Sequence, residues 1–75
     1  MPKKQTKLRL LLAKNLRELR ERKGLSQEKL ADKAKIHRTY VGSIERCEYA
    51  ATIDTLEKIA GVLDVEPHAL IGPLR

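Results

Sequence analysis

Apolar residues recur along this chain at helical spacing, in short stripes that are each preceded by a residue able to cap a helix. The first stripe lies in residues 7–23 and contains Leu8, Leu12, Leu16 and Leu19. A period near 3.6 indicates amphipathic helices, and no segment alternates as a half-buried strand would. Short helices of this kind bury their apolar faces by packing against one another. The sequence therefore predicts an all-α fold, a compact bundle of five helices.

Capping and breaking residues place the ends of these helices. Thr6, Ser26 and Thr52 are good N-caps, and Gly24 can take a positive φ after the first helix. The second helix is expected from residue 27 to about 33, the third over residues 38–46, and the fourth from Thr52 to Asp64, with Ile53 among its inward-facing positions. Pro67 suits the first position of a fifth short helix, and Gly72-Pro73 ends it.

A chain of 75 residues has room for one domain with one modest core. Residues 1–6 are expected to form a flexible basic arm, and residues 7–75 the single domain. Phe and Trp are absent, so Leu, Ile, Val and Ala must build the core. For the same reason, stacking of single-stranded bases on aromatic rings cannot be a main mode of binding.

The positive charge of the chain is unevenly distributed. Of the net charge of +6, residues 1–46 contribute +9, from 14 Lys or Arg against 5 Asp or Glu, and residues 47–75 contribute −3. This asymmetry favours a basic face turned toward a polyanion, with the acidic end pointing elsewhere. Charge alone does not distinguish nucleic acid from membrane lipid.

Neither a membrane segment nor a secretion signal is expected. The apolar run at residues 10–13 is too short for a signal peptide, and no stretch approaches the ~20 apolar residues that span a bilayer. The single cysteine, Cys47, cannot form an internal disulfide, which fits a reducing cytosol. We therefore expect a cytoplasmic protein.

No metal or other cofactor is expected. The soft ligands His37, Cys47 and His68 lack the spacing of a metal site. The sequence also shows no nucleophile–base pair, no paired carboxylates and no phosphate-binding glycine loop, so we do not expect an enzyme. A pocket for a small-molecule ligand is not expected in so small a bundle.

Residues 25–46 have the pattern of two short helices that cross steeply at a tight turn. Five positions must be buried between such helices: Leu30, Ala31, Ile36, Val41 and Ile44. Ala31 is small, as the close approach of two helices requires. The stretch 37–43 is polar and carries side chains that can hydrogen-bond the edges of bases.

From about Leu12 to Ile71 the chain resembles the phage repressor and Cro-like helix-turn-helix family, whose fold is that of the lambda repressor domain. The matching stretches are residues 16–20, 24–31, 38–41, 44–46 and 55–60, together with Leu63. In this short form the chain looks most like the controller proteins of restriction–modification systems, with compact prophage repressors close behind. The helix-turn-helix would then cover about residues 26–46.

The resemblance implies that residues 38–46 are a recognition helix lying in the major groove of double-stranded DNA. Arg38, Thr39 and Ser43 match the family's base-reading positions, with His37 beside them, and we expect all four to contact bases. Arg38 is the leading discriminator, because an arginine on the O6/N7 edge of guanine is the commonest specific contact. The side chains expected near phosphates are those of Gln27, Tyr40, Lys35, Arg46 and Arg17. Tyr40 could equally pack against the domain, and Arg17 could be only solvated.

Other family positions indicate structural roles. The equivalents of Arg20 and Glu45 pair inside the domain, and we expect the same here. Lys35 and Cys47 stand where glycine is common, and Asp64 where glycine or asparagine is common. Cys47 must either accept a left-handed backbone or end the helix differently. It could be a redox switch or, more simply, a neutral loop substitution.

One module of this size buries too little DNA for tight binding, so a homodimer on a palindromic operator is expected. The expected interface is the C-terminal set Val65, Pro67, Leu70, Ile71 and Leu74. The alternative is the N-terminal helix, through Leu8 with Leu11 or Leu10, and both could contribute. Glu28 and Asp32 could contact RNA polymerase or be only a solvated face. The competing functions are an antitoxin that represses its own operon and a helical adaptor that binds protein.

Overall fold

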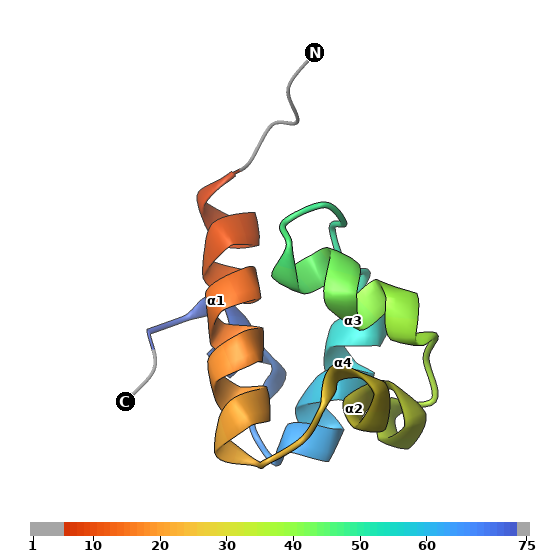
Figure 1. Cartoon of the computed structure of the whole chain (residues 1–75). Helices are drawn as coiled ribbons and strands as arrows, with labels where there is room; N and C mark the ends of the chain where they lie inside the picture. The colour runs from red at the N-terminus through yellow and green to blue at the C-terminus, as the bar shows by residue number, and fades with distance from the viewer. Residues whose placement is uncertain (1–5, 74–75) are drawn as a thin grey trace.

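Four α-helices and one 3-10 helix make up the part of the chain that the computed structural model describes, residues 6–73 (Figure 1). They are α1 (Lys7–Arg22), α2 (Gln27–Ala34), α3 (Arg38–Glu45), α4 (Ile53–Leu63) and η1 (Pro67–Ile71). No strand occurs within these residues, as the sequence predicts. Most of the predicted basic arm, residues 1–5, and the predicted interface residue Leu74 lie outside the described residues.

The prediction of a five-helix bundle is wrong in its last element, because η1 is a 3-10 helix and not an α-helix. Its five residues leave room for few i→i+4 bonds, Glu66 supplies no side-chain cap, and Gly72 returns to extended backbone. The buried amide of Asn15 on α1 donates to the carbonyls of Leu70 at 3.1 Å and Gly72 at 2.7 Å. These bonds satisfy carbonyls at the end of η1 and tie it to α1.

The predicted N-caps begin three of the helices. Thr6, Ser26 and Thr52 each accept a hydrogen bond from the backbone N–H three residues further on. Each such cap stabilises its helix by about 1 kcal/mol. His37 caps α3 instead through its ring, whose Nδ1 accepts from the Thr39 N–H at 3.1 Å. The starts of all four α-helices are thus determined by local contacts.

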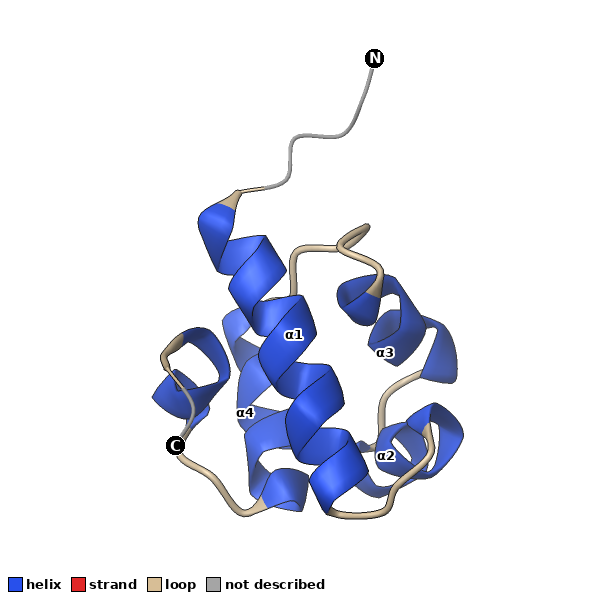
Figure 2. Ribbon diagram, turned by 60° about the vertical axis from the view of Figure 1, so that its left-hand side comes forward, coloured by secondary structure: helices blue, strands red, loops and turns tan. Residues whose placement is uncertain are grey.

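The helices pack around one core, with α1 between η1 and the pair α2–α3 (Figure 2). The fully buried side chains of this core are Leu16, Leu30, Val41, Ile44, Ile59 and Leu70. Leu70, expected at an interface between two copies, is therefore a core residue of one copy. Ile53, expected to face inward, exposes 83% of its surface, because it is the first residue of α4 and precedes the turn that reaches the core. No helix in residues 6–73 has the length and apolarity needed to cross a bilayer.

Among residues 6–73, three residues other than glycine have a left-handed backbone. They are Lys35, Cys47 and Asp64, with φ of 59°, 61° and 59°. The resemblance implies that related proteins commonly have glycine or asparagine at these positions, and here the three residues adopt the left-handed backbone without glycine's freedom. Cys47 thus accepts the left-handed backbone, and its buried thiol donates to the carbonyl of Arg9 at 3.4 Å.

Lys35→Gly is expected to stabilise the domain by about 0.5–1 kcal/mol. Glycine removes the left-handed strain of ~1–2 kcal/mol, partly offset by its greater freedom in the unfolded chain. The matched control is Lys35→Ala, which removes the same exposed side chain but keeps Cβ and should give no gain. Equal unfolding free energies for the two variants in urea titrations would contradict the prediction.

Candidate nucleic-acid interface

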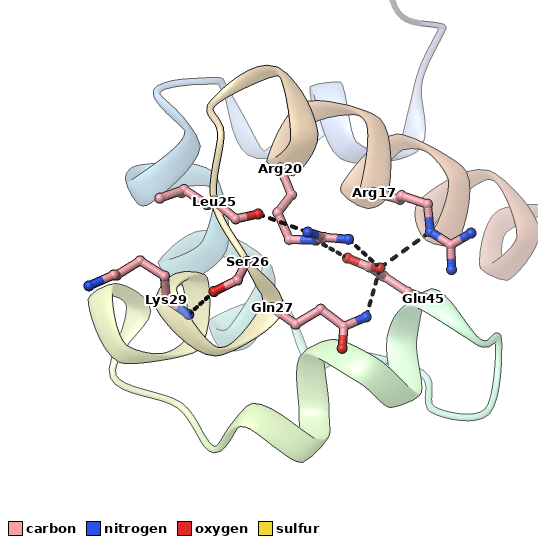
Figure 3. Close-up of polar contacts among 7 residues, drawn as sticks. All are labelled: Arg17, Arg20, Leu25, Ser26, Gln27, Lys29 and Glu45. Atoms are coloured by element: carbon pink, nitrogen blue, oxygen red, sulfur yellow. Dashed lines mark hydrogen bonds and ion pairs between the residues drawn. The ribbon is translucent and has the colours of Figure 1, made fainter.

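Three helices meet at the carboxylate of Glu45, at the end of α3 (Figure 3). Arg20 on α1 donates from Nε to Oε2 at 2.7 Å and from Nη2 to Oε1 at 3.1 Å. Gln27 on α2 donates to Oε1 at 3.0 Å, and Arg17 on α1 donates to the same oxygen at 3.4 Å. The structure thus brings the expected partners Arg20 and Glu45 together, and it adds two residues expected near phosphates.

Burial makes this network a structural joint. The Glu45 side chain has no exposed surface, and that of Arg20 is 12% exposed. Arg20 also donates from Nη1 to the carbonyl of Leu25 at 2.8 Å, which closes the turn between α1 and α2. Arg17, by contrast, is 54% exposed. The carboxylate therefore sets the angle between α1 and the α2–α3 pair, while Arg17 remains accessible to a ligand.

Two opposing effects act on the pKa of Glu45. Burial by itself would raise the pKa of this carboxyl, but the hydrogen bonds from Arg20, Gln27 and Arg17 and the charge of Arg20 together hold it below its ordinary value. The same contact with Glu45 raises the pKa of the Arg20 guanidinium, against the effect of burial. The folded protein therefore holds this pair ionised.

Acid is expected to weaken the domain through Glu45. A carboxyl whose pKa is lower in the folded state contributes stability that is complete above its unfolded pKa, ~4.3, and is lost as the pH falls through the folded value. The free energy of unfolding should therefore fall below about pH 4. Glu45→Gln, less stable at neutral pH, should show a flatter dependence there. Lys23 lowers the pKa of Asp64, and this second source of acid sensitivity is present in both the wild-type and the Glu45→Gln protein. If the two proteins lost stability in parallel as the pH falls, a role for Glu45 would be contradicted.

Helix α3 has one buried and one accessible face. Val41 and Ile44 are buried in the core, whereas Arg38, Thr39 and Arg46 are exposed. The exposed residues lie at the start and end of a two-turn helix, beside the N-terminus of α2. The inner face anchors the helix, and the outer face is polar and basic.

The polar side chains of this outer face have partners within the chain. Arg38 donates from Nη1 to Oε2 of Glu28 at 3.2 Å, and the hydroxyl of Thr39 contacts the ring of His37. Arg46 donates to Glu48 at 3.1 Å and to the hydroxyl of Ser43 at 3.5 Å. These contacts orient the predicted base-reading residues before any ligand is bound.

Gly42 has no side chain, and this leaves room for the guanidinium of Arg46. A Cβ at this position would lie 2.9 Å from Nη1 of Arg46, so the guanidinium passes directly over the helix backbone. The side chain of Arg46 therefore lies along α3 toward α2, where Gln27 is also within reach of such a Cβ at 3.4 Å.

A shallow depression of about 440 Å³ runs between α3 and the start of α2. It is lined by Gln27, Glu28, His37, Arg38, Thr39, Gly42 and Arg46. Five of the nine predicted contact residues thus meet on one surface, whereas the other four, Arg17, Lys35, Tyr40 and Ser43, do not line it. Lys35 is exposed in the turn between α2 and α3.

Tyr40 lies beside this surface and stacks on Tyr49 of the following loop. The ring centroids are 5.2 Å apart and the planes 15° from parallel. Tyr40 nevertheless remains 45% exposed, so the stacking leaves much of this residue accessible to solvent. The contacts that Tyr49, Glu28 and Glu48 make with α3 and its C-cap residue could not be predicted from the sequence, because no periodicity relates these residues to α3.

Known proteins are similar to this chain in sequence and fold. Residues 16–70 match the family model HTH_3, a helix-turn-helix. Control protein C.BamHI of Bacillus amyloliquefaciens is 40% identical over 65 residues, which cover 85% of this chain and 80% of that protein. The crystal structure of the restriction–modification controller protein C.AhdI from Aeromonas hydrophila has a TM-score of 0.80 at 42% identity, covering 83% of this chain and 94% of that one.

A third similar protein is a regulator of another kind. The N-terminal DNA-binding domain of SinR from Bacillus subtilis has a TM-score of 0.81 at 36% identity, covering 84% of this chain and 93% of that one. SinR has also been solved in complex with DNA. These relatives are regulators and not enzymes, in agreement with the sequence analysis. The chain therefore belongs to the helix-turn-helix family of transcriptional regulators, as its resemblance to controller proteins and phage repressors predicts.

Proposed function

We infer that this chain is a sequence-specific regulator that binds double-stranded DNA as a homodimer on a palindromic operator. Helix α3 would lie in the major groove while α2 crosses the sugar-phosphate backbone. The observation that carries this proposal is the polar, basic outer face of α3, joined to the start of α2 and held from behind by Glu45.

Each side chain of this face has chemistry suited to its proposed partner. Arg38 would bond the O6/N7 edge of guanine, and Thr39, Ser43 and His37 would contact neighbouring bases. Gln27 uses one amide N–H on Glu45, and its second N–H remains for a phosphate. The other proposed phosphate contacts are Arg17, Lys35, Tyr40 and Arg46.

Binding to DNA is tested by its salt dependence and by selection. A duplex pool of random sequence, enriched over several rounds of binding, should yield a palindrome with half-sites ~34 Å apart. The logarithm of the binding constant for that duplex should fall linearly with the logarithm of salt concentration, because phosphate contacts release counterions. A helical adaptor for proteins would instead show weak binding that salt hardly changes, and no enriched sequence.

An apolar groove supports the homodimer. It is lined by Thr6, Leu8, Arg9, Leu12, Ala50, Ala51, Leu56 and Ile71. The groove runs from the N-terminal helix to η1, so one residue from each of the two interfaces expected from the sequence, Leu8 and Ile71, lines it. Leu8 exposes 59% and Ile71 38% of its surface. A two-fold axis beside this groove would cover both residues at once. Of the other expected interface residues, Val65 lines a different depression, with His68 and Pro73, and neither Val65 nor Pro67 lines this groove.

Glu substitutions in the groove are expected to separate the dimer. Ile71→Glu and Leu8→Glu each place a charge in an apolar contact, so sedimentation should give the mass of a monomer and operator affinity should fall at least ~10-fold. Leu10→Glu is the control, because Leu10 is on the same helix and 49% exposed but does not line the groove. A dimer that survives Ile71→Glu would place the interface elsewhere.

A further inference from the structure

The arginine proposed to read a guanine is already bonded to a carboxylate. Nη1 of Arg38, in the first turn of α3, donates to Oε2 of Glu28, in the first turn of α2, at 3.2 Å. The two residues are ten positions apart and are joined across the helix-turn-helix. Both line the depression proposed to face DNA. A carboxylate at such a place would repel the phosphates of a duplex.

We propose that Glu28 is a specificity-determining residue, which positions the guanidinium of Arg38 for a guanine and disfavours binding to other DNA. This role rests on the proposed function. In this role Glu28 faces Arg38 and the duplex. The role therefore differs from both alternatives considered from the sequence, a contact with RNA polymerase and a merely solvated face.

The guanidinium can serve both partners. Arg38 has several N–H donors in one plane, and Glu28 takes one of them through Nη1. The remaining donors can bond O6 and N7 of guanine while the carboxylate stays in place. A long arginine otherwise loses rotamer freedom when it binds, and a preformed contact reduces that loss.

The strength of the pair depends on what surrounds it. The side chains of Arg38 and Glu28 are 69% and 66% exposed, so in the free protein water screens their attraction. A bound duplex would exclude much of this water and strengthen the pair. In the free protein the pair is therefore weak and only favours one orientation of Arg38, and it becomes stronger on DNA.

Operator and random DNA would then meet different surfaces. On an operator, guanine bonds Arg38 without removing it from Glu28. On random DNA, the guanidinium has no guanine edge and is drawn to a phosphate, which leaves the Glu28 carboxylate unpaired beside the backbone. Glu28 therefore lowers the affinity for random DNA more than the affinity for the operator.

The test is Glu28→Gln, measured on the selected operator and on a random duplex of equal length. Affinity for random DNA should rise several-fold, and operator affinity should stay level or fall. The ratio of operator affinity to random-DNA affinity should therefore drop several-fold, and up to about tenfold, which is part of the discrimination of a bidentate contact. Asp32→Asn is the matched control, since Asp32 is exposed one turn further along α2 and its loss changes the charge equally. Asp32→Asn should raise the affinities for the operator and for random DNA by the same factor, and so leave the ratio of the two affinities unchanged.

A double-mutant cycle shows whether the effect acts through Arg38. In an Arg38→Ala background, Glu28→Gln should change the ratio no more than Asp32→Asn does. Selection with Glu28→Gln should relax the same base pair that Arg38→Ala relaxes. A ratio unchanged by Glu28→Gln, or changed equally with and without Arg38, would overturn the role of Glu28. A wild-type chain that prefers no duplex at all would overturn the proposed function itself.

Discussion

Replacing Glu45 with alanine is expected to destabilise the domain by about 3–5 kcal/mol, the usual effect of breaking a buried ion pair from one side. The substitution leaves the guanidinium of Arg20 nearly buried without its carboxylate, and it removes the acceptor of Gln27 and Arg17. Native proteins have a total stability of only ~5–15 kcal/mol, so this loss would remove a large fraction of it and bring the domain much closer to unfolding.

Chemical denaturation followed by circular dichroism measures this loss, with Glu18→Ala as the matched control. Glu18 also pairs with an arginine, Arg22, but their side chains are 41% and 48% exposed on α1. An exposed pair of this kind contributes at most about 1 kcal/mol. If the two variants lost equal stability, Glu45 could not be the joint between the three helices.

Arg38→Ala is expected to weaken operator binding by about 1–3 kcal/mol and to relax the preference at one base pair in each half-site. Arg38 is an exposed residue outside the core, so its removal should leave the fold intact. Affinity for random DNA should change much less, because that binding depends on phosphate contacts made by many residues.

Arg22→Ala is the control for this experiment. It removes the same charge from an exposed position on α1, paired with Glu18 rather than with a residue of the proposed DNA face. Band-shift titrations should show little effect of this variant on operator preference. An Arg38→Ala protein that kept both affinity and sequence preference would contradict the assignment of α3 as the recognition helix.

The sequence alone predicted the parts of this protein that depend on near neighbours. The caps Thr6, Ser26 and Thr52 act on an N–H three residues away, so the helix starts can be read from short stretches. The apolar period indicated which faces of α1, α2 and α3 are buried. It was wrong at Ile53, because a period marks a face but not how far along a helix the core extends. The fifth helix, expected from Pro67 and the Gly72-Pro73 stop, was wrong in type, because the five residues Pro67–Ile71 form a 3-10 helix.

Tertiary structure alone decided how these helices act together. The resemblance implied the pair Arg20–Glu45, but only the packed helices bring Arg17 and Gln27 to the same carboxylate. Likewise, Asn15 donates a hydrogen bond to the carbonyl of Leu70, 55 positions further along the chain, and the side chain of Leu70 is buried in the core. The contact between Glu28 and Arg38 exists only because the turn between α2 and α3 places two helix starts side by side. Local spacing determines which face of a helix is apolar, whereas the partner of a polar side chain depends on the packing of the whole chain.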